Sequence, residues 1–212
     1  GSSLFNVITG YSEPPEWHCI EMAPTGLRDR ILLLIEREIQ KASPKRRGHI
    51  IAKMNSLVDR SVIEALYRAS ENNVRIDLIV RGICCLKPGV EGCSSNIRVV
   101  SIVGRFLEHA RVFFFSNGGS SELYLSSADW MPRNFDNRIE TLFPVEEEGI
   151  KQKVLQILKL QLRDNIKGRE LLPSGDYRKV EGGQALNSQQ ATYELICQEK
   201  KRSKRRKKGK GS

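Results

Sequence analysis

Residues 49–80 read HIIAKMNSLVDRSVIEALYRASENNVRIDLIV, and this stretch decides the fold class. The run from His49 to Met54 is short and apolar, as expected of a buried strand, and Val74 to Val80 is a second run of the same kind. Between them, Asp59 to Ala69 places its apolar residues on one face of a helix, with a capping residue at its start. Strand, helix and strand in this order predict an α/β domain.

Further elements are expected on both sides of this unit. Upstream, apolar residues recur at helical spacing from Leu27 to Ile39. Downstream, β-rich sequence precedes a closing amphipathic helix. The later strands and the closing helix are expected over 97–103, 111–115, 123–125, 138–143 and 150–166. The order of these elements predicts a mixed sheet flanked by helices.

The chain divides into four parts by composition. Residues 1–17 are rich in small, polar and proline residues and are interpreted as a linker from an upstream region. Residues 18–170 form the expected domain. Residues 171–199 are interpreted as a Gly-, Pro- and polar-rich connector with a short helix over 189–197, and residues 200–212 as a basic disordered tail.

The charge of the chain is concentrated in that tail. The formal net charge is +10, and nine lysines and arginines lie between 200 and 210, which leaves about +1 for the rest. Such a block binds polyanions or acidic membranes with little selectivity.

The five cysteines lack CxxC or zinc-ligand spacing, and no long apolar run or signal peptide is found. A cytoplasmic protein, peripheral at the membrane through its tail, is therefore expected.

The segment EHARVFFF, residues 108–115, contains the first candidate for chemistry. Side chains alternate along a strand, so His109 and Arg111 are predicted to share a face. A guanidinium holds phosphoryl oxygens as a charged fork, and an imidazole can donate or accept a proton near neutral pH. The pair therefore suits phosphate chemistry. The alternative is a histidine at a strand end that makes one hydrogen bond.

The segment LSSADW, residues 125–130, adds a second candidate. Together the two segments resemble one half-site of the phospholipase D superfamily, in which an H-x-K strand precedes a strand that ends in Gly-Ser-x-Asn. Here Arg111 replaces the lysine and Asp129 replaces the asparagine, and the chain offers one half-site where the superfamily uses two. A phosphodiesterase that dimerises to pair two half-sites is kept as an alternative.

Four longer blocks, in order, make the resemblance specific. They are KMNSLVD (53–59), IVRGICCL (79–86), SIVGRFLEH (101–109) and YLSSADWMPRN (124–134). With them the chain resembles the C-terminal catalytic domain of the long-chain, bacterial-type polyphosphate kinases, from about residue 4 to about residue 199. This resemblance implies a phospholipase D-like α/β fold.

The resemblance also implies an activity. The family reversibly transfers the terminal phosphoryl group of ATP onto inorganic polyphosphate, through a phosphohistidine on a domain outside this chain. Arg81 and His109 lie on matching motifs and are expected to contact the nucleotide phosphates, with His109 as proton donor or phosphate clamp. ATP or ADP is the implied substrate, with Mg²⁺ held by ligands outside this chain. The implied partners are the remaining domains and further copies in a homo-oligomer.

Other residues are expected to support this site. Lys53 and Asn55 share a strand face, which predicts either a lining of the phosphate channel or a solvated lysine beside a turn. Ser127 and Asp129 are expected to fix the backbone and orient His109. Arg133 is expected to hold the polyanion or to pair with a neighbouring carboxylate. A non-catalytic module that binds polyanions through its basic tail is the alternative function.

Overall fold

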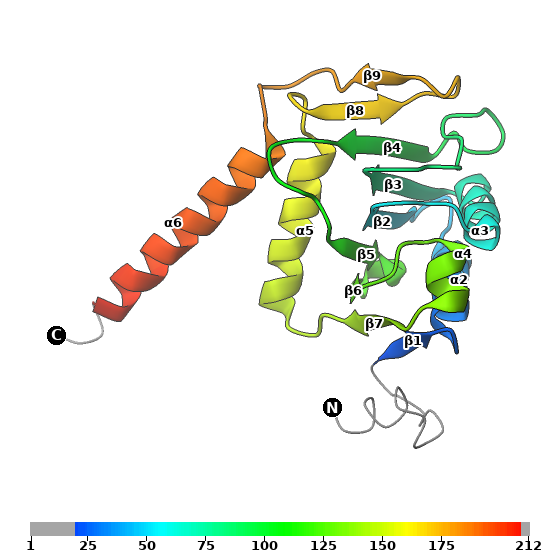
Figure 1. Cartoon of the computed structure of the whole chain (residues 1–212), viewed down its shortest axis with the longest axis horizontal. Coiled ribbons are helices and arrows are strands. Elements are labelled where there is room, and N and C mark those ends of the chain that lie inside the picture. Colours follow the sequence, from blue (N-terminus) through cyan, green and yellow to red (C-terminus); the bar gives the residue numbers. More distant parts are fainter. Residues whose placement is uncertain (1–19, 209–212) are drawn as a thin grey trace.

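The structure, a computed structural model, describes residues 20–208. Its strands are β1 (Glu21–Ala23), β2 (Gly48–Met54), β3 (Val74–Val80), β4 (Ile97–Ile102), β5 (Arg111–Phe115), β6 (Glu122–Ser126), β7 (Glu140–Pro144), β8 (Gly168–Leu171) and β9 (Tyr177–Lys179). They form one sheet in the order β1-β7-β6-β5-β2-β3-β4-β8-β9 (Figure 1). Strands β2, β3 and β4 are parallel, and the other neighbouring pairs are antiparallel. The expected mixed sheet is confirmed.

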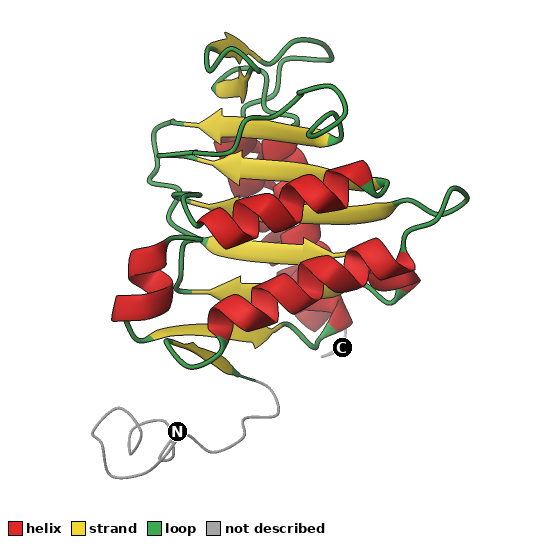
Figure 2. Cartoon of the chain, turned by 90° about the vertical axis from the view of Figure 1, so that its right-hand side faces the viewer, coloured by secondary structure: helices red, strands yellow, loops and turns green. Residues whose placement is uncertain are grey.

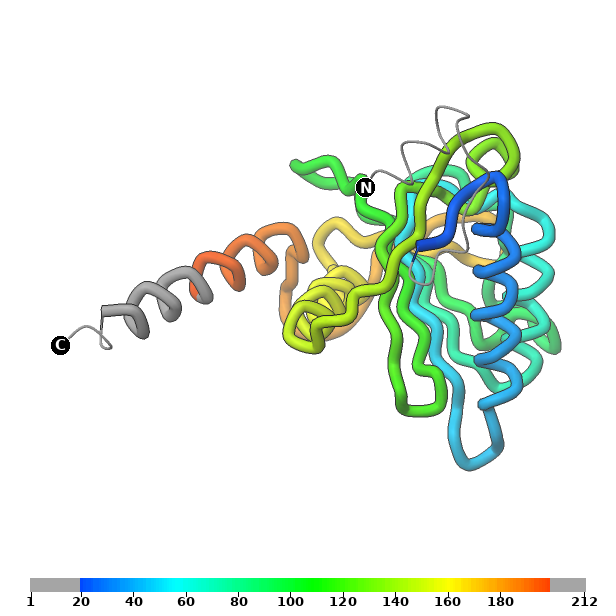
Figure 3. The backbone as a smooth tube through the Cα atoms, turned by 90° about the horizontal axis from the view of Figure 1, so that it is seen from below, coloured from blue at the N-terminus to red at the C-terminus, as the bar shows by residue number. Residues whose placement is uncertain are grey.

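Helices cover both faces of this sheet. They are α2 (Leu27–Lys41), α3 (Arg60–Glu71), α4 (Pro132–Asn137), α5 (Glu148–Leu162) and α6 (Ser188–Lys208), with a 3-10 turn η1 at Asn117–Gly119. Helices α2 and α3 lie on one face and α5 lies on the other, as Figures 2 and 3 show. Helix α6 contacts α5 and then extends away from the body of the domain (Figure 1).

The sheet separates two apolar cores. In β5, Phe113 and Phe115 belong to the core under α2 and α3, whereas Val112 and Phe114 belong to the core under α5. Because successive side chains of a strand point to opposite faces, a central strand covered on both sides must be apolar throughout. This explains why the apolar runs of β2, β3 and β5 identified their strands.

Helix α3 begins where its sequence predicts. The Asp59 side chain accepts a hydrogen bond from the Val62 backbone N–H at 3.1 Å, which satisfies one free donor of the first turn. The predicted apolar face of this helix is buried against the sheet. An N-cap of this kind stabilises a helix by about 1 kcal/mol.

The two ends of the described chain differ from the sequence-based expectation. The segment expected to be a connector ends β8 and forms β9, which add to the sheet beyond β4. These strands are short and mostly polar, so their position is set by backbone pairing, of β8 with β4 and of β9 with β8, and not by an apolar pattern. The elements β1 and α4 were not predicted either, because each is too short to show a strand or helix period. The closing helix begins and ends slightly earlier than expected.

Helix α6 is the largest difference. It was expected over 189–197, followed by a disordered tail, but it continues through the basic segment to Lys208. Lysine and arginine are good helix formers, so a helix that has already started is propagated through them. The expected linker 1–17 and the last residues of the tail, 209–212, lie outside the described residues. Within the described part, no helix is long and apolar enough to cross a membrane.

Candidate active site

The candidate site lies at one edge of the sheet, where several strands begin or end. Asn55 follows β2 and Arg81 follows β3, and because these strands are parallel and in register, the two residues emerge side by side. Strand β5 runs antiparallel to β2, so its first residue, Arg111, lies at the same edge. Asp129 follows β6, the antiparallel partner of β5. Ligand sites of α/β sheets commonly lie at the carboxyl ends of parallel strands.

Asp129 is the centre of the site. Its side chain is buried, with 7% of the residue exposed, and its Oδ1 accepts from the backbone N–H of Asn55 at 2.7 Å and from Asn55 Nδ2 at 3.2 Å. Arg111 donates from Nε to Oδ1 at 3.1 Å and from Nη2 to Oδ2 at 3.0 Å. A two-point ion pair of this kind fixes the plane of the guanidinium.

The same network extends to the two residues expected to contact phosphate. Arg81 donates from Nε and Nη2 to Asn55 Oδ1, at 3.1 and 2.8 Å. On the other side, Arg111 Nη1 lies 2.8 Å from His109 Nδ1 and donates to the His109 backbone oxygen at 2.9 Å. A guanidinium has no acceptor, so Nδ1 of the imidazole must accept, and the proton of the neutral ring is on Nε2. Five predicted residues are thus joined in one chain of hydrogen bonds.

The predicted strand face shared by His109 and Arg111 is wrong. Strand β5 begins at Arg111, so His109 lies in the preceding loop and does not share a strand face with Arg111. The two side chains meet nevertheless, because the guanidinium reaches back to both the ring and the carbonyl group of His109.

Lys53 is buried, so the alternative of a solvated lysine is wrong. It is 5% exposed and forms an ion pair with Glu108, which also accepts from Gln161 Nε2 and Gln189 Nε2, each at 2.9 Å. Burial alone would raise the pKa of Glu108, but the hydrogen bond and charge of Lys53, with the two glutamine donors, lower it below its usual value. Sequence reasoning missed this carboxylate, although it immediately precedes His109.

Ser127 and Arg133 lie at the margin of the site. Ser127 Oγ accepts from the Thr141 backbone N–H at 3.0 Å, so it fixes the β6–β7 connection, and in the described part of the chain no hydrogen bond joins its side chain to His109. Arg133 is exposed on α4 and has no ion-pair partner among the described residues. The alternative prediction, an ion pair of Arg133 with a neighbouring carboxylate, is not found within residues 20–208, where Asp136 pairs with Arg28 at 2.8 Å.

Two buried residues, Asn134 beside Asp129 and the neighbouring Trp130, were not among the residues predicted for the site. Asn134 Oδ1 accepts from the Asp129 backbone N–H at 2.9 Å. Trp130 packs against Phe113 with ring centroids 4.8 Å apart, and its backbone oxygen accepts from the N–H of Asp59 at 2.9 Å. Both lie in the YLSSADWMPRN block, so a longer motif was the available signal.

The described residues offer no ligand set for Mg²⁺. No group of three or more His, Cys, Asp or Glu side chains within residues 20–208 could hold a metal ion. The Asp129 oxygens are occupied by Arg111 and Asn55, and the Glu108 oxygens by Lys53 and two glutamines. A hard cation requires several oxygen ligands, so these carboxylates do not fit it.

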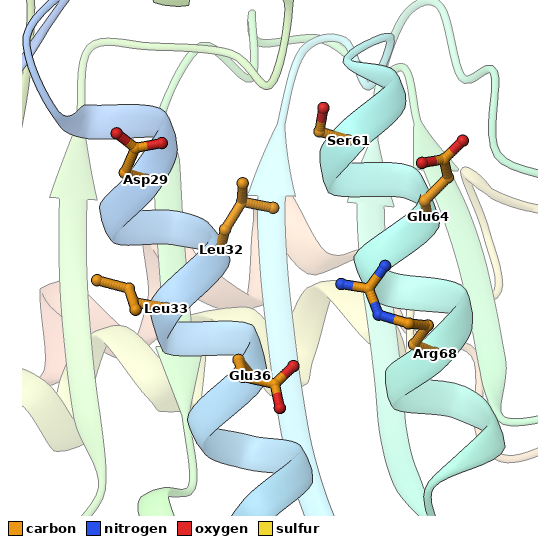
Figure 4. A pocket seen from close by; sticks show the side chains of 7 residues that line it. All are labelled: Asp29, Leu32, Leu33, Glu36, Ser61, Glu64 and Arg68. Carbon is orange, nitrogen blue, oxygen red and sulfur yellow. The ribbon is translucent and has the colours of Figure 1, made fainter.

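A separate groove of about 470 Å³ lies between α2 and α3. Figure 4 shows its lining, which is formed by Asp29, Leu32, Leu33 and Glu36 of α2 and by Ser61, Glu64 and Arg68 of α3. It shares no residue with the network around Asp129.

Comparison with known proteins gives a consistent family. Residues 20–192 match the family model described as polyphosphate kinase C-terminal domain 2. Polyphosphate kinase 1 of Chlorobaculum tepidum is 51% identical over 201 residues, which is 94% of this chain and 29% of that protein. Polyphosphate kinase of Halalkalibacterium halodurans is 52% identical over 179 residues, 84% of this chain and 25% of that protein. The chain therefore spans between a quarter and a third of the length of these relatives.

Solved structures agree with this result. The crystal structure of polyphosphate kinase from Porphyromonas gingivalis matches with a TM-score of 0.90 and 42% identity, over 94% of this chain and 31% of that one. Nuc from Salmonella typhimurium, a phospholipase D family member, matches with a TM-score of 0.53 and 12% identity, over 72% of this chain and 97% of that one. The second likeness shows the fold alone. The chain belongs to the polyphosphate kinase family and corresponds to its C-terminal domain of phospholipase D-like fold.

Proposed function

We propose that this domain holds phosphate groups of ATP and polyphosphate during reversible transfer of the terminal phosphoryl group of ATP onto polyphosphate. The names of its relatives give the reaction class. Phosphoryl transfer requires fixed positive charge around the moving group and little covalent help from the protein. The guanidinium-rich edge of the sheet supports this role.

The observation that carries the proposal is the hydrogen-bonded chain that joins Arg81, Asn55, Asp129, Arg111 and His109. Two guanidinium groups and one carboxylate leave a net positive charge beside an imidazole. Each group is held by at least one neighbour, so little side-chain freedom is lost when an anion binds. The edge is therefore prepared for phosphate oxygens before the ligand arrives.

Arg81 and His109 are the expected contacts to phosphate. Arg81 uses Nε and Nη2 for Asn55, and Nη1 has no acceptor among the described residues. His109 is exposed and directs Nδ1 to Arg111, which leaves Nε2 to donate to a phosphoryl oxygen. In this proposal the phosphohistidine and the Mg²⁺ ligands belong to other domains of the longer enzyme. This chain alone is then expected to bind ATP weakly and to turn over negligibly.

The test is calorimetric titration of the chain with Mg-ATP and with short polyphosphate. We expect the Arg81→Ala, His109→Ala double variant to bind at least about tenfold more weakly, since it loses charge-assisted hydrogen bonds. Arg60→Ala is the matched control, because it removes an exposed guanidinium that pairs only with Glu64 on the same helix. Equal affinities of the double variant and the unmodified chain would refute the proposal.

A second candidate function is supported by the basic segment. Nine lysines and arginines lie between 200 and 210, and α6 carries most of them away from the body of the domain. Such a segment supports binding to polyphosphate, nucleic acid or acidic membranes without selectivity. A dimeric phosphodiesterase has less support, because the likeness to a phospholipase D family member concerns the fold alone.

A further inference from the structure

The loop that carries His109 depends on few packing contacts. It connects the end of β4 to the start of β5, and three of its apolar side chains face solvent: Val103 is 68% exposed, Phe106 is 56% exposed and Leu107 is 71% exposed. A segment with so little buried apolar surface opens easily unless hydrogen bonds hold it. What fixes His109 near Arg111 must therefore be sought outside the loop.

Gln189, at the start of α6, supplies those hydrogen bonds. Its Oε1 accepts from the Phe106 backbone N–H at 3.0 Å, and its Nε2 donates to the Phe106 oxygen at 2.8 Å. The same Nε2 donates to Glu108 Oε1 at 2.9 Å. One buried amide thus binds the loop at two residues, including the residue that directly precedes His109.

The position of Gln189 is itself fixed by a buried carboxylate. Asp164 Oδ2 accepts from the backbone N–H and from Oγ of Ser188, at 2.8 and 2.7 Å. Asp164 Oδ1 accepts from the N–H of Ile166 and Lys167, at 3.0 and 2.7 Å. The first turn of α6 is therefore attached to the segment that joins α5 to β8, and the amide of Gln189 has a defined place relative to the sheet.

We propose that Gln189 is a positioning residue for the phosphate site: it holds the 103–110 loop so that His109 meets Arg111. The inference rests on the proposed function, because it assigns a purpose to the loop geometry only if His109 contacts phosphate. Glu108 is bound by Lys53 of β2 and Gln161 of α5, and Gln189 adds the hydrogen bonds from α6. Ordering the loop beforehand lowers the entropy lost when an anion binds.

Gly104 lies next to the Gln189 amide and gives an independent way to test whether Gln189 holds the loop. A Cβ added to Gly104 would lie 2.6 Å from Gln189 Oε1 and 2.9 Å from its Cδ, closer than such atoms approach in proteins. Gly104 has no left-handed backbone conformation, so Gly104→Ala adds steric pressure on the Gln189 amide without backbone strain. The side chain of Gln189 is flexible and can move, so this variant should break the hydrogen bonds between Gln189 and the loop and leave the fold intact.

The experiment compares Gln189→Ala and Gly104→Ala with the control Gln190→Ala, whose side chain bonds only to Glu194 on α6. Amide hydrogen exchange of residues 103–110 reports the loop without any ligand, and calorimetry with tripolyphosphate reports the site. We expect exchange of the Phe106 amide to be about tenfold faster in both test variants, and the dissociation constant to rise about 5- to 10-fold, as for the loss of about one net hydrogen bond. The control should change neither value.

The outcomes separate the two proposals. If the unmodified chain does not bind tripolyphosphate, the proposed function fails, and the exchange rates still show whether Gln189 holds the loop. Unchanged exchange in Gly104→Ala and Gln189→Ala would overturn the inference. Faster exchange with unchanged affinity would also overturn it, because Gln189 would then hold the loop without positioning His109 for phosphate. Should Gln189→Ala fold poorly, as judged by its urea midpoint, Gly104→Ala alone decides between these results.

Discussion

Arg111 holds Asp129 with two nitrogens of its guanidinium, Nε to Oδ1 at 3.1 Å and Nη2 to Oδ2 at 3.0 Å, and directs the third towards His109. The orientation of the imidazole is therefore set by a buried carboxylate that the imidazole does not touch. A lysine ammonium is a point charge and could not join both groups in one plane. The two differences from the phospholipase D pattern are therefore linked: Arg111, in place of lysine, binds Asp129, in place of asparagine.

Removal of the Asp129 charge should weaken both the fold and the site. Asp129→Asn replaces the buried carboxylate that accepts from the Arg111 guanidinium with a neutral amide. We expect the free energy of unfolding to fall by about 2 kcal/mol, and tripolyphosphate affinity to fall with it, because charge-assisted hydrogen bonds are lost. Urea denaturation and calorimetry measure the two effects. Asp136→Asn, which breaks an exposed pair with Arg28, should have a much smaller effect on stability.

The Lys53–Glu108 pair predicts a specific dependence of stability on pH. The pKa of Glu108 is lowered in the folded protein, so the ionised form stabilises the fold at pH values above the ordinary glutamate pKa of about 4.3. That contribution is lost as the pH falls through the folded pKa, below this value. Glu108→Gln should therefore be clearly less stable than the unmodified chain at pH 7 and nearly equal to it at pH 2.

Urea denaturation of both proteins at the two pH values tests this. Glu108→Gln also leaves the Lys53 ammonium buried without its anion, so the double variant Lys53→Met, Glu108→Gln should regain stability at pH 7. A stability difference between Glu108→Gln and the unmodified chain that does not vary with pH would contradict the assignment.

Gly82 should be sensitive to substitution because the backbone passes close by. Its N–H donates to the backbone oxygen of Asn55 at 2.7 Å, and a Cβ added to Gly82 would lie 2.9 Å from the same backbone oxygen. Gly82→Ala should force the ends of β2 and β3 apart, which would cost about 1–3 kcal/mol of stability and weaken tripolyphosphate binding. Gly149→Ala, in α5, meets a side-chain oxygen at 3.5 Å and should instead stabilise slightly. Thermal denaturation distinguishes the two variants.

Deletion of residues 200–212 separates the two candidate functions. The deletion removes nine positive charges that lie outside the network around Asp129. If the site binds the nucleotide, affinity for Mg-ATP should remain within about twofold, while affinity for long polyphosphate should lose most of its steep dependence on salt. Titrations at several salt concentrations measure both. A large loss of Mg-ATP affinity after deletion would favour the basic segment as the binding site.

Much of the candidate site could be predicted from the sequence, because its residues lie at the ends of strongly apolar strands. Asn55 and Arg81 follow β2 and β3 directly, and the register of two parallel strands brings them together. The sequence also predicted that Ser127 and Asp129 orient His109, and this stays a prediction. The sequence did not indicate that Arg111 connects Asp129 to His109, because the strand face that His109 and Arg111 were expected to share does not exist.

The sequence by itself determined the elements whose signal is local: the buried strands, the capped helix after Asp59 and the family motifs. Only the tertiary structure decided that Glu108 pairs with Lys53, that Gln189 binds a loop 83 residues earlier, and that β9 completes the sheet. The physical reason is that strand and helix periodicity describes which face of one element is apolar. It contains no information on which polar groups of distant elements meet once those faces are buried together.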